Sequence, residues 1–258
     1  MRVNGYMPGQ PCWSELATHD WQGAKCFYRD LFGWEIADVA LPGTEFSMFT
    51  LDGDDLGAIY QVSEISADDS KTQWSIYFAT EDVELTISKV VAAGGQLVMG
   101  PHDIGLAGRM AQLTDAEGAH FAVWQSNRHI GAKRRSEPGT LCWIELASRA
   151  PSAAHKFYSD VFGWDYRDSD ITDMPYSEWL VSGEAHGGML EMTPEWGDMP
   201  PHWMLYFQVL DCDDYALRAK KLGGTVCVPP TKIPGVGRFA VLKDPDGGVF
   251  SVIALQES

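Results

Sequence analysis

The chain contains the same long segment twice, roughly 130 residues apart. Residues 12–17, which read CWSELA, return as CWIELA at residues 142–147. The octapeptide FYRDLFGW at residues 27–34 returns as FYSDVFGW at residues 157–164. A duplication this long predicts two copies of one fold, so a functional site is to be sought within each copy or where the two copies meet.

Charge excludes several classes of partner. The 258 residues include 36 Asp and Glu against 19 Lys and Arg, a net charge of −17. This excess of negative charge repels nucleic-acid phosphates and anionic membranes. No apolar stretch approaches the roughly 20 residues of a membrane span, and the first residues do not resemble a signal peptide. We therefore expect a cytoplasmic protein, monomeric or homodimeric, with no nucleic-acid or membrane partner.

Each copy reads as strand, helix and three strands, followed by the same order again. Residues 11–17 alternate in polarity as a strand does, and a helix with apolar positions at helical spacing follows until Gly33. Turn residues such as Asp244-Pro245-Asp246-Gly247 predict hairpins near the end of each copy. The sequence therefore predicts a first domain at 1–128, a linker at 129–138 and a second domain at 139–258.

The predicted linker carries the basic run Lys133-Arg134-Arg135. Three basic residues are a weak signal for nucleic-acid binding, and we interpret the run as a solvated connector. In the second copy, Trp196 lies in a Pro-rich segment that has no similar counterpart in the first copy. We expect this segment to be a loop that can cover a site of the second copy.

These motifs resemble the vicinal oxygen chelate superfamily of glyoxalases, bleomycin-resistance proteins and dioxygenases. The matching residues are E-L-A and F-Y-x-D-x-F-G-W in both copies, together with G-x-G-R-x-A-x-L-x-D-P-D-G at residues 235–247. The chain is most similar to the tandem, actinobacterial glyoxalase-like proteins often labelled hydroxylases. The resemblance implies an α+β fold of two glyoxalase-like domains, in which four βαβββ modules form curved mixed sheets with helices on the convex side.

The resemblance also implies where a metal would be held, because enzymes of this family bind a divalent ion on the concave face of each sheet with His, Gln or Glu. Counted from the shared motifs, the corresponding positions are Trp13, Ser75 and Ala122 in the first copy and Trp143, Met204 and Ser251 in the second. None of these is an imidazole or a carboxylate, the donors that Mn²⁺, Fe²⁺, Ni²⁺ and Zn²⁺ require. The sequence therefore predicts no metal and no cofactor.

Strand alternation predicts which side chains occupy the concave faces instead. The predicted ligand-binding residues are Trp13, Glu15, Tyr77, His120, Trp124, Trp143, Glu145 and Tyr206. Aromatic walls around a single carboxylate suit a flat, largely apolar ligand. Packing in a closed core remains the alternative role for Trp13 and Trp143.

The candidate catalytic residues are Glu15, Glu145 and His120. A carboxylate on an apolar face has a raised pKa and needs a partner. Its possible partners are the phenols Tyr77 and Tyr206, or the guanidinium groups Arg109 and Arg238. His120 has Val249 as its counterpart, which favours a site in the first copy, with a buried core histidine as the alternative. The other histidines look like scattered surface or loop residues.

Three functions are compatible with these residues. The first is metal-independent binding of an aromatic or hydrophobic small molecule, a secondary metabolite or antibiotic, for sequestration, resistance or biosynthesis. The second is a cofactor-free lyase, isomerase or cyclase in which Glu15 or Glu145 moves a proton. The third is a metal-dependent glyoxalase or dioxygenase, as the family resemblance implies.

Overall fold

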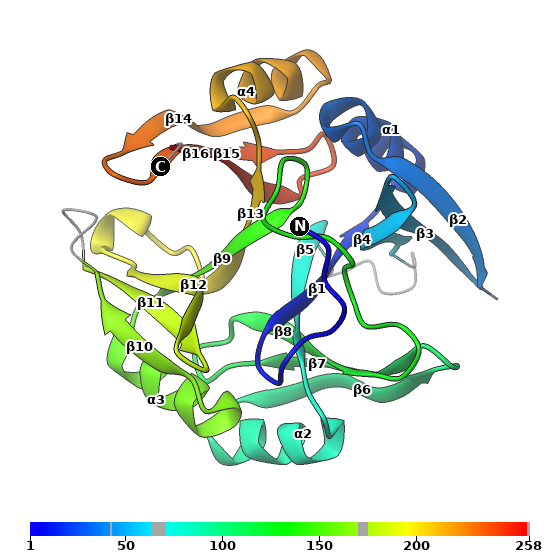
Figure 1. Ribbon diagram of the computed structural model, residues 1–258. Coiled ribbons are helices and arrows are strands. Elements are labelled where there is room, and N and C mark those ends of the chain that lie inside the picture. The colour runs from blue at the N-terminus through cyan, green and yellow to red at the C-terminus, as the bar shows by residue number, and fades with distance from the viewer. Residues whose placement is uncertain (42, 63–70, 170–174, 257–258) are drawn as a thin grey trace.

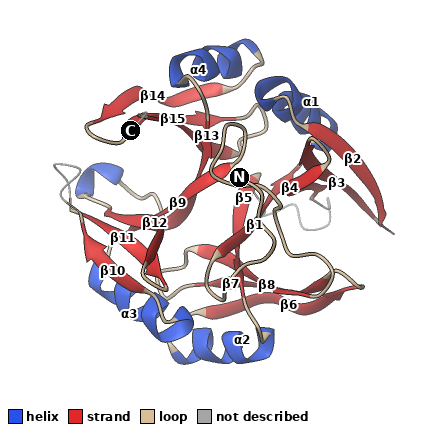
Figure 2. Ribbon diagram, viewed as in Figure 1, coloured by secondary structure: helices blue, strands red, loops and turns tan. Residues whose placement is uncertain are grey.

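Each copy of the repeat builds one curved, eight-stranded sheet (Figures 1 and 2). The computed structural model describes residues 1–41, 43–62, 71–169 and 175–256. The last two residues of the predicted second domain therefore lie outside the described residues. No helix in the described part of the chain is both long and apolar enough to cross a bilayer.

The elements of the first copy are β1 (Pro11–Thr18), α1 (Trp21–Phe32), β2 (Glu35–Leu41), β3 (Thr44–Leu51), β4 (Asp54–Gln61), β5 (Gln73–Ala79), α2 (Val83–Ala92), β6 (Gln96–Ile104), β7 (Gly108–Thr114) and β8 (His120–Ser126). Those of the second are β9 (Leu141–Ser148), α3 (Pro151–Phe162), β10 (Asp165–Asp168), β11 (Tyr176–Val181), β12 (Glu184–Glu191), η2 (Pro194–Trp196), β13 (His202–Gln208), α4 (Cys212–Lys221), β14 (Thr225–Ile233), β15 (Gly237–Lys243) and β16 (Val249–Leu255).

Strand order shows how the four modules combine. The first sheet runs β2-β3-β4-β1-β5-β8-β7-β6, and the second runs β10-β11-β12-β9-β13-β16-β15-β14. The opening strands of the two modules, β1 and β5, pair antiparallel at the centre, as β9 and β13 do. The two modules of one copy therefore pair with each other, and the helices lie outside each curved sheet (Figure 1). This confirms the predicted fold class.

Local sequence explains the helices. Asp20 precedes α1, and its side chain accepts a hydrogen bond from the amide of Gly23 at 2.9 Å. Gly33 ends the helix in the left-handed conformation, with φ of 76°, and its amide bonds to the carbonyl of Arg29. In the second copy α3 begins with Pro151 instead of a side-chain cap and ends at Gly163 in the same way.

The convex sides of the two copies pack on each other around a reciprocal hydrogen-bond exchange. The hydroxyl of Tyr28 on α1 donates to Asp244 of the second copy, and that of Tyr158 on α3 donates to Asp115 of the first, each at 2.9 Å. Both aspartates also hold the hairpin turn that they begin, by accepting from backbone amides that follow. The predicted hairpin turns are thus also the places where the copies meet.

One aromatic core fills the space between the copies. The ring of Phe32 lies 5.4 Å from that of Phe207, and the ring of Phe78 lies 5.1 Å from that of Trp164. Large buried rings stabilise a core mainly through the apolar area that they remove from water. This core leaves the two concave faces, which we call the first cup and the second cup, on opposite sides of the molecule (Figure 1).

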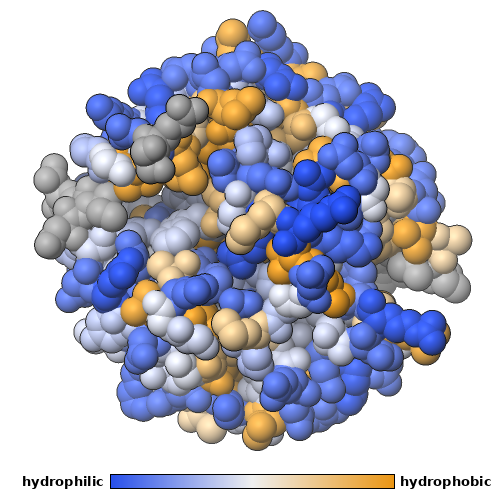
Figure 3. All heavy atoms as spheres, in the orientation of Figure 1, coloured by the Kyte–Doolittle hydropathy of each residue, from blue (hydrophilic) through white to orange (hydrophobic). Residues whose placement is uncertain are grey.

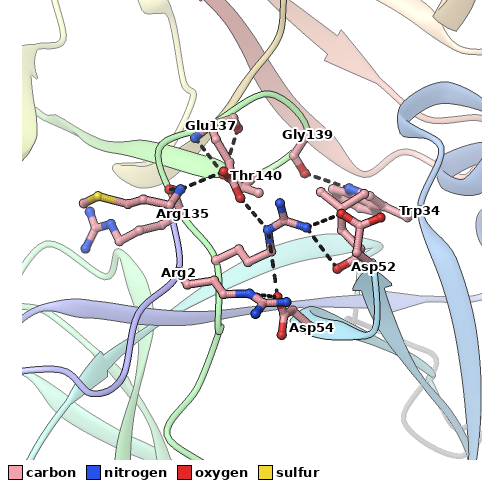
Figure 4. A network of polar contacts seen from close by, with 11 residues as sticks. Arg2, Trp34, Asp52, Asp54, Arg135, Glu137, Gly139 and Thr140 are labelled. Carbon is pink, nitrogen blue, oxygen red and sulfur yellow. Dashed lines mark hydrogen bonds and ion pairs between the residues drawn. The ribbon is translucent and has the colours of Figure 1, made fainter.

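The predicted linker is not a solvated connector. Its amide at Ala132 donates to the carbonyl of Cys12 at 2.8 Å, and Lys133 Nζ lies 2.8 Å from Asp55 Oδ2. Arg134 contacts Asp52 and Glu137, within a network that also includes Arg2 and Asp54 (Figure 4). The segment at 129–138 is therefore fastened to the first copy, and the interpretation of its basic run as solvated was wrong.

Candidate functional site

Strand register brings the predicted residues of the first cup together. Trp13 on β1 is opposite Tyr77 on β5, and Tyr77 is opposite Ala122 on β8. Glu15, two residues after Trp13, is opposite Ser75 and is paired with Ala58 on β4. Because residues two apart on a strand share a face, Trp13 and Glu15 both point to the concave side.

The carboxylate of Glu15 is bonded through both oxygens. Its Oε1 accepts from Trp13 Nε1 at 3.2 Å, and its Oε2 accepts from the hydroxyl of Tyr77. Burial raises the pKa of Glu15, and these two hydrogen bonds partly offset the rise. Tyr77 is therefore the partner of Glu15. Pairing with Arg109 was the wrong alternative, because this guanidinium bonds to other acidic side chains.

The arginines named as alternative partners lie outside the cups. Arg109 contacts Glu84 and Asp103, each at 2.6 Å. Arg238 contacts Asp213, also at 2.6 Å. Neither guanidinium can therefore neutralise the carboxylate of its own cup.

The linker closes one end of the first cup. The imidazole of His129 meets the ring of Trp13 edge-on at 4.8 Å, and its backbone carbonyl accepts from Trp124 Nε1 at 2.8 Å. The hydroxyl of Tyr6 donates to the carbonyl of Ala132 at 2.7 Å over the same end. As a result Trp13 is only 6% exposed. His129 lies in a loop, as predicted, but it is not a scattered surface residue, because its ring packs against Trp13.

His120 lies apart from this cluster. It is the exposed first residue of β8, and its strand partner is Thr114. Its side chain is therefore neither the buried core histidine considered as one alternative nor a neighbour of Glu15 in the hydrogen bonds described above. A role for His120 in catalysis or binding remains a prediction.

The second cup holds an equivalent carboxylate with a different set of phenols. Tyr206 on β13 donates to Glu145 Oε1 at 2.8 Å, and Trp143 Nε1 donates to the hydroxyl of Tyr176 at 3.0 Å. Burial raises the pKa of Glu145, and hydrogen bonding from Tyr206 and Tyr176 offsets part of the rise. Sequence reasoning did not identify Tyr176, which comes from β11.

Gly188 makes room for Tyr176. A β-carbon at Gly188 would lie 1.9 Å from the Tyr176 hydroxyl, so only glycine lets this phenol cross β12 toward Glu145. In the first cup the corresponding residue is Ala58, and the additional phenol comes from Tyr60 on β4. Burial first, and the nearby charge of Glu15 second, raise the pKa of Tyr60 to about 12.

The floor of the second cup contains an unsatisfied hydroxyl. Ser251 on β16 is fully buried opposite Tyr206, and its Oγ has no hydrogen-bond partner of standard geometry. It is near enough to Tyr206 to lower slightly the pKa that burial raises at that phenol. A buried hydroxyl without a partner costs about 1–3 kcal/mol, so a ligand atom that bonds to it would gain affinity.

The loop around η2 borders the second cup. Trp196 packs against the cluster of Ala147, Leu190 and Met192, as Met204 does, near the end of β9. Arg149 Nη2 donates to the backbone carbonyls of Gly197 and Met199, at 2.6 and 2.8 Å, and holds the loop in place. The expectation that this loop covers part of the second cup agrees with these contacts.

The two cups differ in how open they are. Trp143 is partly exposed, whereas its counterpart Trp13 is covered by the linker. The surface is hollowed over β9 and β12, left of centre in Figure 3. An organic molecule can therefore approach the indole of the second cup more readily than that of the first.

The residues at the family's metal positions do not fit a divalent metal. In the first cup the positions correspond to an indole, a methyl group and the single hydroxyl of Ser75, and the neighbouring carboxylate already accepts two hydrogen bonds. In the second they correspond to an indole, the thioether of Met204 and the hydroxyl of Ser251. Among the described residues no three His, Cys, Asp or Glu side chains are grouped so as to hold an ion. The cups therefore lack the set of donors that a divalent metal requires.

Comparison with known proteins agrees with this architecture. The family model described as the glyoxalase/bleomycin resistance protein/dioxygenase superfamily matches residues 13–123 and 140–252. The CFP32 protein of Mycobacterium tuberculosis is 42% identical over 251 residues, which cover 96% of this chain and 95% of that protein. The anthracycline biosynthesis protein DnrV of Streptomyces peucetius is 34% identical over 264 residues, covering 98% and 95%.

Solved structures share the fold at lower identity. The Mn(II)-bound glyoxalase from Novosphingobium aromaticivorans superposes with a TM-score of 0.67 at 21% identity, covering 97% of this chain and 83% of that one. The 2,3-dioxygenase LapB from Pseudomonas sp. KL28 gives 0.65 at 15% identity, covering 98% and 94%. At these identities the comparison concerns the fold alone, and the chemistry must be argued from the residues in the cups.

Proposed function

Because the chain belongs to the glyoxalase/bleomycin resistance protein/dioxygenase superfamily, a fold that serves several chemistries, we propose its function from the contents of the cups. The function is metal-independent binding of an aromatic or hydrophobic small molecule in the second cup. Such a molecule is a secondary metabolite or antibiotic, bound for sequestration, resistance or as an auxiliary step in its biosynthesis. The expectations of a cytoplasmic, cofactor-free protein belong to the same proposal.

One observation carries the proposal. The partly exposed indole of Trp143 stands in the same row of strands as Tyr206 and the unsatisfied hydroxyl of Ser251. A flat ring system can stack on the indole, and one polar group can bond to the buried serine once the ring of Tyr206 moves aside, a combination of stacking and hydrogen bonding that small-molecule sites commonly use.

The relatives support an aromatic ligand. Two of them, 34% identical, are described as anthracycline biosynthesis proteins, and anthracyclines are flat, fused-ring molecules. A ligand of that shape matches the second cup, whose partly exposed wall includes Tyr176, Trp143 and Met204. Thioether and aromatic side chains both make favourable contacts with aromatic rings.

Quenching of tryptophan fluorescence tests the proposal. Protein treated with a chelator is titrated with naphthalene, anthracene and 1-hydroxyanthraquinone, and the dissociation constant is measured for each. We expect affinity to rise with ring number and to rise further for the compound with oxygen groups. Trp143→Ala should weaken binding at least tenfold, about 1.4 kcal/mol, while Trp143→Phe retains most of it. An equally weak response to all three compounds contradicts the proposal.

A second candidate function rests on the two carboxylates. Glu15 and Glu145 both have a raised pKa and a phenol at hydrogen-bond distance, the arrangement of a general acid or base. In a cofactor-free lyase, isomerase or cyclase, Glu15→Gln or Glu145→Gln abolishes turnover and changes ligand affinity by less than about tenfold. Unchanged turnover in both variants eliminates this candidate.

Elemental analysis of the same purified protein distinguishes the third candidate function from the first two. A metal-dependent glyoxalase or dioxygenase contains near-stoichiometric nickel, zinc, manganese or iron by elemental analysis and loses activity on chelation. We expect no stoichiometric metal and undiminished ligand binding after chelation. Activity restored by one added metal supports the metal-dependent function and contradicts ours.

A further inference from the structure

The three basic residues of the linker are not equivalent. Lys133 Nζ lies 2.8 Å from Asp55 Oδ2. Arg134 Nη1 lies 2.6 Å from Asp52 Oδ2, and Arg134 Nε lies 2.5 Å from Glu137 Oε1. These two cations therefore fasten the linker to the first copy (Figure 4).

The side chain of Arg135 takes no part in that network. Its backbone exchanges hydrogen bonds with Met1, at 3.0 and 2.6 Å, and its side chain extends away from the network in Figure 4. The side chain is partly buried, and among the described residues no carboxylate pairs with its guanidinium. In a chain with a net charge of −17, a half-buried and unpaired cation is an unusual feature.

The linker brings Arg135 to the beginning of β9, where the second copy starts. The amide of Ser136 donates to the carbonyl of Leu141 at 3.0 Å, which brings the linker against the beginning of β9. The charge of Arg135 opposes the rise in pKa that burial causes at Cys142 of the second copy, and it does the same at Tyr6 of the N-terminal segment. Cys142 and Trp143 are both partly exposed at this end.

The neighbouring histidine does not compete for the guanidinium. Gln10 Oε1 accepts from the amide of Met7 at 2.9 Å, so its Nε2 donates to His186 Nε2 at 3.0 Å. His186 Nε2 is then an acceptor, and the ring is neutral. Burial first, and the charge of Arg135 second, lower the pKa of His186.

We propose that Arg135 is the anion-binding residue of the second cup, and that the ligand is a planar aromatic molecule carrying an ionised oxygen group. The rings stack on Trp143, and the anionic oxygens pair with the guanidinium, whose planar fork of donors suits a carboxylate. This inference rests on the proposed function, to which it adds the charge of the ligand and the end of the cup at which the charge is held.

The test compares two probes of equal shape, 2-naphthoate and the neutral 2-naphthamide. Their dissociation constants are measured by calorimetry for the wild-type chain and for Arg135→Gln, with Lys133→Gln as a control that removes the same charge two residues away. We expect the wild type to prefer naphthoate at least tenfold. Arg135→Gln should abolish this preference and change naphthamide affinity less than threefold. Lys133→Gln should keep it.

A conservative variant and a folding check complete the test. Arg135→Lys should keep part of the preference, because the charge remains while the planar fork is lost. Thermal melting shows whether each variant is folded. If Arg135→Gln does not fold, the preference of the wild type for naphthoate is measured at raised salt instead. A preference that depends on a charged group should disappear there.

The outcomes separate this inference from the proposed function. Equal affinity of the wild type for both probes, or a preference retained in Arg135→Gln, overturns the anion-binding role while the cup still binds aromatic molecules. Binding of neither probe to the wild type overturns the proposed function and, with it, this inference.

Discussion

In the first cup Trp13 is 6% exposed beneath the linker, whereas its counterpart in the second cup, Trp143, is partly exposed beside Arg135. The two carboxylates differ in the opposite sense: Glu145 of the second cup is only 8% exposed, whereas Glu15 of the first cup is more accessible. The sheets that carry these residues have the same strand order. The two sheets therefore keep the same hydrogen-bonded carboxylate. The irregular segments around them determine which end of each cup a ligand can reach.

Removing the two indoles should give the largest effects. Trp13→Ala leaves a cavity under the linker and should lower the free energy of unfolding by about 3–5 kcal/mol. Trp143→Ala should cost less than half as much, because its indole is already partly in water. Urea denaturation measures both. Equal losses would mean that the two cups are equally closed.

Adding one methyl group at Gly188 should give the next largest effect. Gly188→Ala places a carbon where the Tyr176 hydroxyl lies, so the phenol must move away from Trp143. We expect a loss of about 1–3 kcal/mol in the free energy of unfolding, as for other overpacked sites. A stability within experimental error of the wild type would show that Tyr176 can move freely.

A triple variant gives the second cup the three residues that the first cup has at the corresponding positions. The first cup combines Phe46, Ala58 and Tyr60 at positions that correspond to Tyr176, Gly188 and Leu190. Introducing these three residues together should recover most of the stability that Gly188→Ala loses. Failure to recover it would place the cause outside this exchange of phenols.

The carboxylates give a smaller, pH-dependent effect. Because the folded protein raises the pKa of Glu145, the protonated acid favours folding, and this stability is present below the unfolded value of about 4.5 and is lost as pH rises toward the folded pKa. Glu145→Gln should therefore gain about 1 kcal/mol or more over the wild type at pH 7. The gain should disappear near pH 4. Thermal melting at both pH values measures it.

The same change at Glu15 supplies the comparison. Glu15 is the more exposed of the two, so Glu15→Gln should show a smaller gain with the same direction. A larger gain at Glu15 than at Glu145 would contradict the assignment of the second carboxylate as the more deeply buried one.

The smallest effect on stability is expected at the η2 loop. Arg149→Ala removes two exposed hydrogen bonds to Gly197 and Met199 and should cost no more than about 1 kcal/mol. Because the loop borders the second cup, dissociation of a bound aromatic probe should become several times faster, as stopped-flow fluorescence can measure. Lys156→Ala, which removes a surface ion pair with Asp160, is the control.

Regular structure explains what the sequence could predict. Strand alternation placed Glu15 with Tyr77 and Glu145 with Tyr206, because period-two patterns fix the face on which a side chain lies. The helix ended by Gly33 and the hairpin turn at Asp244 followed from local conformational preferences. The partners on the two central strands of each sheet were therefore predictable from spacing.

Irregular and cross-strand contacts were not predictable in the same way. His129 and Arg135 lie in a linker without periodicity, so no pattern indicates which cup they approach. Tyr176 reaches Glu145 only because Gly188, on the neighbouring strand, has no side chain. A glycine facing a tyrosine across a predicted hairpin was the one available signal. His120 belonged to a strand but stood at its exposed first position, where alternation says little about burial.

Tyr28 bonds to Asp244, and Tyr158 bonds to Asp115. Because each copy makes the same contact with the other, the packing of the core does not depend on which copy comes first in the chain. Each copy offers the other the same pair of groups, so the packing is set by surfaces and not by which copy is synthesised first. A circularly permuted gene, opening with residue 139 and joining the old termini through a flexible spacer, should therefore encode a protein with the same interior. Its two cups would then be free to diverge further without disturbing what lies between them.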